Sequence, residues 1–344
     1  MKQLECCQET ASTQEFQDAP MATASPPFEA LISEVGPRDG LQSVKNRMST
    51  ADKCAWIDAL AASGLREIEV GSFVSPKLLP QMADTAAVVA HALRHKGVTI
   101  MALVPNLHGA KAAIEAGVHK ITMPISASPA HSLANVRKTP EEMIDEVKNI
   151  IALRNEMAPR VHVEAGISTA FGCTIQGVVP EDGVIALAAA CARAGVDEVG
   201  LSDTTGMANP AQVRRLFRRL IAELGGKAGA AHMHNTRGLG LANCLAAHDV
   251  GTRTFDASLA GLGGCPYAPG ASGNVVTEDL VFMFEAMGIR TGVDVQALIA
   301  AREALARGLP GEALYGMTPL AGLPKGFGQD SYGPEHGMTR AGAF

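Results

Sequence analysis

LISEVGPRDGLQSVKNRMSTADKCAWIDALAA, residues 31–62, shows the unit from which most of the chain is built. Its apolar run Leu31–Val35 predicts a β-strand, and Thr50–Ala62 predicts a helix with Thr50 as its N-cap. Repetition of a strand followed by a helix predicts a parallel sheet flanked by helices.

The same alternation continues along the chain, with eight candidate strands in roughly 260 residues, the usual size of a (β/α)8 barrel. The seven strands after the first are predicted at Glu67–Val70, Val98–Leu103, Lys120–Met123, Val161–Ile167, Glu198–Leu201, Ala230–His234 and Arg253–Asp256. A helical segment follows each, such as Asn209–Leu224 with Pro210 at its first position. We therefore predict an α/β fold, a TIM barrel, although strand count alone also fits a doubly wound sheet.

Polar residues at the strand ends favour the barrel over the doubly wound sheet. In a TIM barrel the functional groups gather where the strands end, because the loops after all eight strands converge on one face. The polar residues at these ends are Arg38, Asp39, Glu69, Asp203, His232 and His234. Several strands are thus expected to contribute to one pocket.

The two ends of the chain differ from the barrel region in composition. Residues 1–27 are rich in Gln, Glu, Ser, Thr and Pro and predict a flexible tail. The barrel domain is predicted to cover residues 28–310, with its last helix at Val295–Arg307. Residues 311–344, rich in Gly and Pro, predict an irregular C-terminal extension.

Composition and charge exclude several classes of protein. The net charge of −6 argues against a nucleic-acid-binding protein, which would need a basic surface. The longest apolar stretch, Val184–Ala192, is well short of the ~20 residues that span a bilayer. Seven scattered cysteines indicate reduced thiols rather than a disulfide framework. We expect a cytoplasmic protein without nucleic-acid or membrane partners.

The motif His232-Met233-His234 is the sharpest local signal for chemistry. Residues two apart on a strand share one face, so both imidazoles can reach one metal ion. Asp39, directly after the first strand, is the natural third ligand, because only the eighth strand separates the first from the seventh in a closed barrel. The alternatives are two separate hydrogen-bonded core histidines and a surface ion pair between Arg38 and Asp39.

A third signal is the glycine-rich segment GLGGCPYAPGASGN at residues 261–274. So many permissive backbone positions predict a mobile loop or a loop that closely approaches a ligand. Cys265 within it is either an acid or base delivered as the loop closes, or a small buried filler residue.

These stretches together resemble the metal-dependent TIM-barrel lyases related to 3-hydroxy-3-methylglutaryl-CoA lyase, a family that also contains isopropylmalate and homocitrate synthases. The matching text, over about residues 30–295, is EVGPRDGLQ at 34–42, EVGSFVSPKLLPQM at 69–82, SDTTGMANP at 202–210, HMHNTRGLGLAN at 232–243 and GLGGCPYAPGASGNVVTEDLV at 261–281. The resemblance implies cleavage of 3-hydroxy-3-methylglutaryl-CoA to acetyl-CoA and acetoacetate, a step of leucine degradation.

The resemblance also implies roles for individual residues. Asp39, His232, His234 and Asn274 would bind Mg²⁺ or Mn²⁺, with no organic cofactor. The catalytic residues would be Arg38, Cys265, Asp39, Glu69 and Asp203, with Cys265 transferring a proton. An acyl-CoA would contact Arg38, Gln42, Ser72, Asn135 and Thr204, and we expect a homo-oligomer, either a dimer or a tetramer.

The chain departs from the family pattern beside the expected acyl pocket. Glu164 and Gly166 stand where the family commonly has Arg and Tyr, Cys173-Thr174-Ile175-Gln176 replaces Cys-Pro-Tyr-Glu, and Asn235 replaces an Asp. These changes favour, as an alternative, a lyase for a different 3-hydroxyacyl-CoA. Two further alternatives are a synthase that condenses acetyl-CoA with a 2-oxo acid, disfavoured by the Cys265 loop, and a non-catalytic barrel that binds CoA esters.

Overall fold

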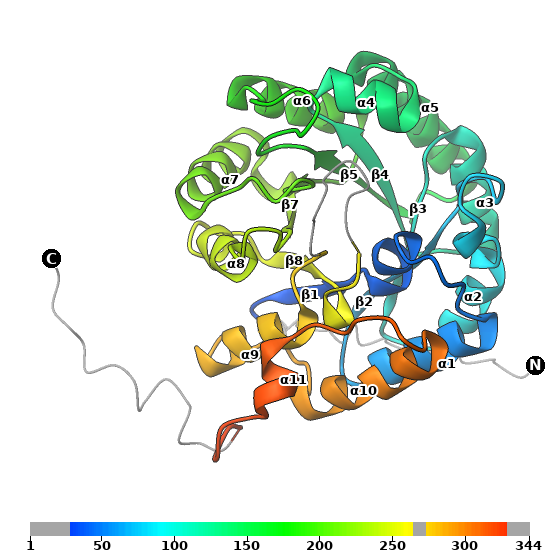
Figure 1. Ribbon diagram of the computed structural model, residues 1–344. Coiled ribbons are helices and arrows are strands. Elements are labelled where there is room, and N and C mark those ends of the chain that lie inside the picture. The colour runs from blue at the N-terminus through cyan, green and yellow to red at the C-terminus, as the bar shows by residue number, and fades with distance from the viewer. Residues whose placement is uncertain (1–27, 264–272, 329–344) are drawn as a thin grey trace, which may run out of the picture.

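The computed structural model of the protein describes residues 28–263 and 273–328, and within them eight parallel strands close into a barrel in sequence order (Figure 1). The strands are β1 (Leu31–Glu34), β2 (Glu67–Ser72), β3 (Thr99–Leu103), β4 (Lys120–Ser126), β5 (His162–Ser168), β6 (Glu198–Ser202), β7 (Ala228–His232) and β8 (Thr254–Ala257). Pairing of β1 with β8, from Leu31 with Thr254 to Glu34 with Ala257, closes the ring. The predicted TIM barrel is confirmed, and the doubly wound sheet is wrong.

The helices form an outer ring around these strands (Figure 1). They are α1 (Thr50–Ala62), α2 (Thr85–Ala92), α3 (Leu107–Ala116), α4 (Pro129–Val136), α5 (Pro140–Met157), α6 (Glu181–Ala194), α7 (Pro210–Leu224), α8 (Gly240–His248), α9 (Thr277–Ala286), α10 (Val295–Gly308) and α11 (Met317–Ala321). The apolar core lies between this ring and the strands, where side chains such as Ile32, Ile68 and Trp56 are at most 1% exposed. Helix burial against the sheet is what stabilises the barrel.

Two predicted helix starts had different outcomes. The N-cap of α1 is Ser49 rather than Thr50, because the Ser49 side chain accepts the Asp52 N–H, so Thr50 is the first helical residue. In α7 the Asn209 side chain caps the helix and Pro210 occupies its first position, as the sequence predicts.

The C-terminal residues are more ordered than predicted. Within residues 311–328 the chain forms α11, and the Asp279 carboxylate accepts the N–H groups of Met317 and Thr318 at its start. A carboxylate at this position satisfies helical N–H groups that have no partner within the helix.

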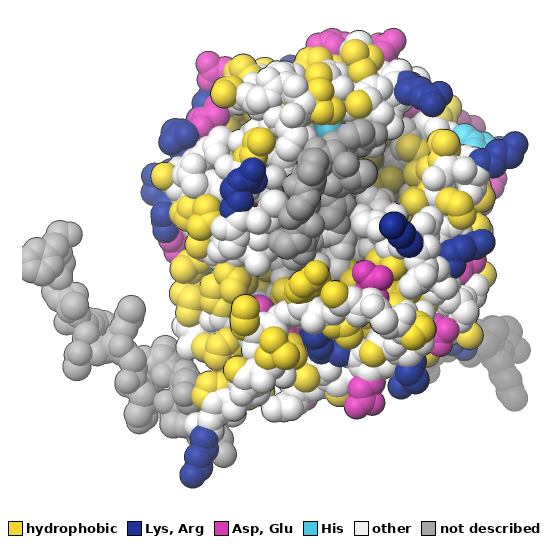
Figure 2. All heavy atoms as spheres, viewed as in Figure 1, with side chains coloured by type: hydrophobic (Ala, Val, Ile, Leu, Met, Phe, Trp, Pro, Cys, Tyr) yellow, Lys and Arg dark blue, Asp and Glu magenta, His cyan; other side chains and the backbone are white. Residues whose placement is uncertain are grey.

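Three further features bear on the sequence-based expectations. Among the helices of the described residues, none combines the length and apolar character needed to cross a membrane. The described cysteines, Cys54, Cys173, Cys191 and Cys244, are free thiols. On the face shown in Figure 2, basic and acidic side chains are interspersed, both around the edge and nearer the centre.

Candidate active site

A cavity of about 1210 Å³ opens at the carboxyl ends of the barrel strands. Its lining includes Arg38 and Asp39 after β1, Glu69 of β2, His232 of β7 and His234. These side chains come from segments far apart in sequence, as predicted from the positions of polar residues at strand ends.

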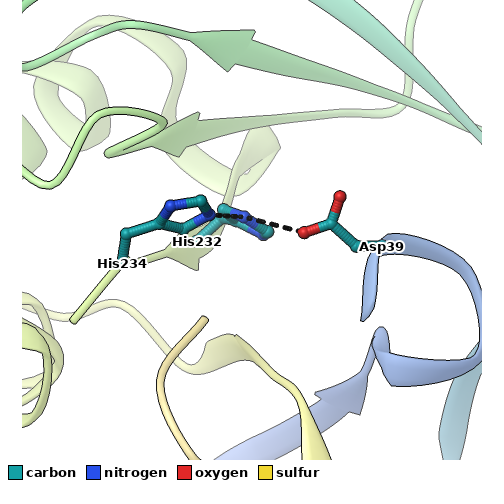
Figure 3. Close-up of side chains that lie close together, drawn as sticks. All are labelled: Asp39, His232 and His234. Carbon is teal, nitrogen blue, oxygen red and sulfur yellow. Dashed lines mark hydrogen bonds and ion pairs between the residues drawn. The ribbon is translucent and has the colours of Figure 1, made fainter. Parts of the chain in front are cut away.

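Asp39, His232 and His234 converge at one point of this cavity (Figure 3). The two histidine Nε2 atoms are 3.3 Å apart, and His232 Nε2 is 3.8 Å from Asp39 Oδ2. Their potential ligand atoms all lie within 4.8 Å of one another. The structure therefore brings the predicted metal ligands together, and the alternative of two unrelated core histidines does not fit this geometry.

The backbone after β1 positions Asp39. Residues Gly36–Gly40 form one π-helical turn, in which the Asp39 N–H donates to the Val35 carbonyl at 2.7 Å. The Glu34 carboxylate holds this turn by accepting the Gly36 N–H at 2.8 Å, and it also accepts the Leu259 N–H at 2.9 Å and the Thr277 hydroxyl at 2.6 Å. Burial raises the pKa of Glu34 to about 8 despite these hydrogen bonds.

Asn274 joins the metal-ligand group from the far end of the glycine-rich segment. Its Nδ2 donates to Asp39 Oδ2 at 2.6 Å and to the Leu262 carbonyl at 3.2 Å. Gly273 precedes it with φ +90°, and a Cβ there would lie 2.1 Å from the Gly261 carbonyl oxygen, so this crossing requires glycine. Cys265 lies outside the described residues.

His234 follows the strand rather than ending it, because β7 runs two residues earlier than the predicted Ala230–His234. A single antiparallel bridge to Asn274 holds it instead. The alternation of side chains along the strand nevertheless continues through this bridge. As predicted from it, both imidazoles face the cavity.

The pKa values of Asp39 and His234 suit a metal ion. Burial alone would raise the pKa of Asp39, but the charges of Arg38, His232 and His234 outweigh it and lower the pKa to about 2. Burial and the neighbouring His232 lower the pKa of His234 to about 4. An ionised carboxylate and a neutral imidazole are the forms that bind metals.

Unpartnered buried atoms provide a further test of this fit. Asn274 Oδ1 and His234 Nδ1 are buried and make no hydrogen bond of regular geometry among the described residues, although the two side chains lie within reach of each other. Buried polar atoms are normally paired, so an amide oxygen left unpaired beside Asp39 is consistent with a role as ligand. The donor set of one carboxylate, two imidazoles and one amide oxygen fits a divalent ion with open positions for water or substrate.

Arg38 lies beside the metal-ligand group, in a buried ion pair rather than in a surface turn. Its Nη1 contacts Asp39 Oδ1 at 2.6 Å and its Nε contacts Glu69 Oε2 at 2.5 Å, and its side chain is 11% exposed. Glu69 also accepts a hydrogen bond from the Thr122 hydroxyl. Glu69 thus fixes the direction of the guanidinium at the cavity wall.

Asp256 on β8 is a residue that the sequence reasoning missed. Its Oδ2 lies 3.0 Å from His232 Nδ1, on the side of the ring opposite the ligand nitrogen. Burial would lower the pKa of His232, but the hydrogen bond and charge of Asp256 raise it. A carboxylate behind a metal-binding histidine fixes ring orientation and tautomer. Its position at the end of the predicted eighth strand was the available signal.

The remaining predicted site residues do not all line the cavity. Gln42, Asn135 and Thr204 line the cavity, and Gln42 Nε2 donates to Asp39 Oδ1 at 3.2 Å. Asp203 accepts the N–H groups of Met207 and Ala208, and burial raises its pKa to about 6. Ser72 is buried in β2, where its N–H donates to Thr85 Oγ1, and is not among the described residues that line the cavity; its contact with substrate stays a prediction.

The departures from the family pattern lie in the cavity wall. Glu164 is held by Lys120, whose Nζ is 2.7 Å from its Oε2 and also contacts Glu67 at 3.4 Å and Glu198 at 3.1 Å. Burial raises the pKa of Glu164 to about 8. At Gly166 an added Cβ would meet nothing closer than the Met123 carbonyl at 3.9 Å. The wall is therefore open at Gly166, and Lys120 is already in contact with three carboxyl groups.

The other two departures do not reach the cavity lining. Cys173 is buried, and its sulfur accepts the N–H groups of Ile175 and Gln176. Asn235 accepts the Gly240 N–H at the start of α8, and its own N–H donates to the Gly273 carbonyl. Both residues stabilise local loop structure.

Comparison with known proteins agrees with the fold and the site. A model of the HMGL-like family matches residues 30–305. Hydroxymethylglutaryl-CoA lyase YngG of Bacillus subtilis is 43% identical over 277 residues, covering 80% of this chain and 91% of that protein. The 3-hydroxy-3-isohexenylglutaryl-CoA/hydroxy-methylglutaryl-CoA lyase of Pseudomonas aeruginosa is 41% identical, with coverage of 80% and 91%.

Solved structures give the same result. An HMG-CoA lyase from Acinetobacter baumannii, in complex with coenzyme A and 3-methylmalate, matches with a TM-score of 0.81 and 40% identity. The match covers 87% of this chain and 97% of that chain. The resemblance inferred from the motifs is confirmed: the chain belongs to the HMGL-like family and is an enzyme of the lyase type that these relatives represent.

Proposed function

We propose that this enzyme cleaves 3-hydroxy-3-methylglutaryl-CoA to acetyl-CoA and acetoacetate with a divalent metal ion. The observation that carries the proposal is the convergence of Asp39, His232 and His234 beside Arg38 in one cavity. Lyases of this name share about two-fifths of their residues with the chain over most of its length. The HMG-CoA lyase crystallised with coenzyme A supports an acyl-CoA as the ligand.

The ion would be Mg²⁺ or Mn²⁺, held by Asp39, His232, His234 and the amide oxygen of Asn274. When bound, it supplies Lewis acidity that lowers the pKa of a substrate hydroxyl. Asp256 orients His232, and Asp203 and Glu69 order the surroundings of the site. The carboxylate and carboxamide oxygens favour these hard ions, and the imidazole nitrogens favour Mn²⁺ over Mg²⁺.

Cleavage breaks the bond between the second and third carbons of the acyl group. The tertiary hydroxyl gives its proton to a base or water at the site, the third carbon becomes the ketone of acetoacetate, and the bonding electrons pass into the thioester as an enolate, which then needs one proton back. Arg38 would stabilise this enolate, because a guanidinium stays charged and a mostly buried site strengthens its field. Cys265 would return a proton to the second carbon and complete acetyl-CoA. Gln42, Asn135 and Thr204 would contact the substrate.

A lyase for a bulkier 3-hydroxyacyl-CoA is the second candidate. The open wall at Gly166 favours it, since a larger group on the third carbon could occupy this space. The relative from Pseudomonas aeruginosa is named for an isohexenylglutaryl-CoA as well as for the methyl compound. Lys120 is already paired with Glu164, so this part of the described wall offers no free cation to a substrate.

A substrate panel tests both candidates. Acetyl-CoA release should be measured for 3-hydroxyglutaryl-CoAs that carry methyl, butyl or isohexenyl groups on the third carbon. The first candidate predicts the highest kcat/KM for the methyl compound, and this result would exclude the second. Faster turnover of a bulkier compound, lost on Gly166→Tyr, would establish the second candidate, whereas acetyl-CoA release from none of them would exclude both.

We further propose that residues 28–310 form the catalytic domain, with residues 311–344 as an extension. Glu312 and Tyr315 of that extension line the cavity, so the extension contributes to one wall. The resemblance supports a cytoplasmic homo-oligomer that acts in leucine degradation. Size-exclusion chromatography with light scattering would measure the assembly.

A further inference from the structure

A second group of potential metal ligands lies on the outside of the barrel, between α1 and α2. Asp58 comes from α1, His91 from the last turn of α2, and His95 from the residues after it. Asp58 Oδ1 is 2.6 Å from Nε2 of His91 and 2.6 Å from Nε2 of His95. Besides the active-site group, no other three-residue group in the described part of the chain meets this geometry.

This group lies at the opposite end of the barrel from the cavity. Asp58 belongs to the last turns of α1, which ends shortly before β2 begins at Glu67, and His95 precedes the start of β3 at Thr99. The cavity opens at the other, carboxyl ends of the strands. In Figure 1 α1 and α2 are neighbours in the outer ring. The proposed function therefore makes no use of these three residues.

The chemistry of the group matches a late first-row transition ion. Two imidazole nitrogens and one carboxylate oxygen form a set that suits Zn²⁺ and Ni²⁺ better than Mg²⁺. Ligation at about 2.0–2.2 Å places neighbouring ligand atoms roughly 3.0–3.5 Å apart, so the present contacts of 2.6 Å must widen by about 0.4–0.9 Å. The side chains are 46%, 19% and 27% exposed for Asp58, His91 and His95, so they can move apart and leave positions for water.

Arg94 is a built-in competitor for the ion. Its Nη2 lies 2.5 Å from His91 Nδ1, and its Nε donates to the His91 carbonyl at 3.2 Å. A cation here repels a bound metal ion, and a hydrogen bond to Nδ1 holds the tautomer in which Nε2 keeps its proton. Because the contacts of Arg94 lie at the exposed surface, it can swing away when a metal ion binds.

We propose that Asp58, His91 and His95 form a second metal site, which binds a Zn²⁺-class ion and links α1 to α2. Hydrogen bonds from Lys53 and Thr50 to Asp84 already join the start of α1 to the start of α2. A metal link between the far ends of the same helices would fasten the pair at both ends. Residues at this end of a TIM barrel contribute to stability rather than to catalysis.

Binding of Ni²⁺ to the full-length chain tests the site, because Ni²⁺ is retained by histidines and competes less for thiols. Isothermal titration is done on a double variant, Asp39→Ala with His234→Ala, which removes two of the four ligands of the active-site group. One Ni²⁺ should bind per chain, and His95→Ala should weaken binding on the order of tenfold or more, since one of three ligands is lost. Arg94→Gln should tighten binding, and the exposed His108→Ala should leave it unchanged.

Two further measurements keep the outcome clear. Ni²⁺ should raise the Tm of the unchanged chain, and this rise should disappear in Asp58→Asn, which preserves side-chain shape. If the double variant fails to fold, the unchanged chain and His95→Ala are compared directly, and His95→Ala should hold one Ni²⁺ fewer. Equal Ni²⁺ stoichiometry and affinity in His95→Ala and its parent would overturn the proposal. Acetyl-CoA release should not change in His95→Ala, so failure here is separate from failure of the proposed function.

Discussion

Replacement of Asp256 by Asn removes the charge that holds His232 without removing the shape of the side chain. In the structure the carboxylate accepts from His232 Nδ1 at 3.0 Å and leaves Nε2 facing His234 and Asp39. The carboxamide introduced by Asp256→Asn could still accept this hydrogen bond, but as a neutral group, and it could also rotate to offer its NH₂. The variant should therefore bind the active-site metal ion more weakly.

The size of the effect follows from the type of hydrogen bond. A hydrogen bond to a charged group contributes about 1.5–3 kcal/mol, and a neutral one about 0.5–1.5 kcal/mol. The difference, about 1–1.5 kcal/mol, corresponds to roughly a 5- to 13-fold loss of affinity. Loss of the preferred tautomer adds to this, which places Asp256→Asn near the lower half of the 10- to 100-fold range of such partners, at roughly 10- to 30-fold.

Titration of the variant with Mn²⁺, followed by the electron paramagnetic resonance of the free ion, measures this loss. The kcat for acetyl-CoA release should recover once Mn²⁺ saturates the variant, because Asp256 acts through His232. Asp249→Asn, at an exposed ion pair with Arg214, is the control and should bind Mn²⁺ normally. Unchanged affinity in Asp256→Asn, or a kcat that stays low at saturating Mn²⁺, would refute the reasoning.

Three other changes test the remaining parts of the account. Arg38→Gln should lower kcat by about 10²–10³-fold, as loss of one preorganised donor does, and steady-state kinetics showing only a raised KM would contradict its role. Cys265→Ala should lower kcat by about 10²–10⁴-fold and leave Mn²⁺ binding intact, and full activity would remove the cysteine from proton transfer. Glu34→Gln should gain stability relative to the unchanged chain as pH rises from 5 to 8. The reason is that the pKa of Glu34 is about 8 in the folded state and 4.5 ordinarily. Protonated Glu34 therefore contributes fully to the free energy of unfolding below pH 4.5, and this contribution is lost as pH rises through 8. Urea unfolding at both pH values measures this, with the exposed Glu141→Gln as control, and parallel behaviour of Glu34→Gln and the unchanged chain would count against it.

The sequence was sufficient for the barrel and for the grouping of Asp39, His232 and His234. Apolar runs alternating with helical segments marked every strand, and the shared face of His232 and His234 follows from strand geometry alone. The predicted strand ends were less accurate. At β7 the strand ends at His232, and His234 is held by a bridge to Asn274, a tertiary contact that the local sequence does not reveal. The N-cap moved from Thr50 to Ser49 because both residues are favoured at that position and only the Asp52 N–H distinguishes them.

Residues that act through other residues could not be predicted from their neighbours in sequence. Their contacts depend on how the strands pair: Asp256 meets His232 where β8 pairs with β7, and Glu34 meets Leu259 where β1 closes against β8. The same is true of Lys120, which contacts Glu164 across adjacent strands. Ser72, a motif position, is not among the described residues that line the cavity, and its predicted contact with substrate stays a prediction.

Removal and return of the metal ion tests the central claim most directly. Protein stripped with a chelator should release no acetyl-CoA from 3-hydroxy-3-methylglutaryl-CoA, and Mn²⁺ should restore release in the unchanged chain but not in His234→Ala. Full acetyl-CoA release by the stripped protein, or restoration by Mn²⁺ in His234→Ala, would contradict the assignment of Asp39, His232 and His234 as the catalytic metal site.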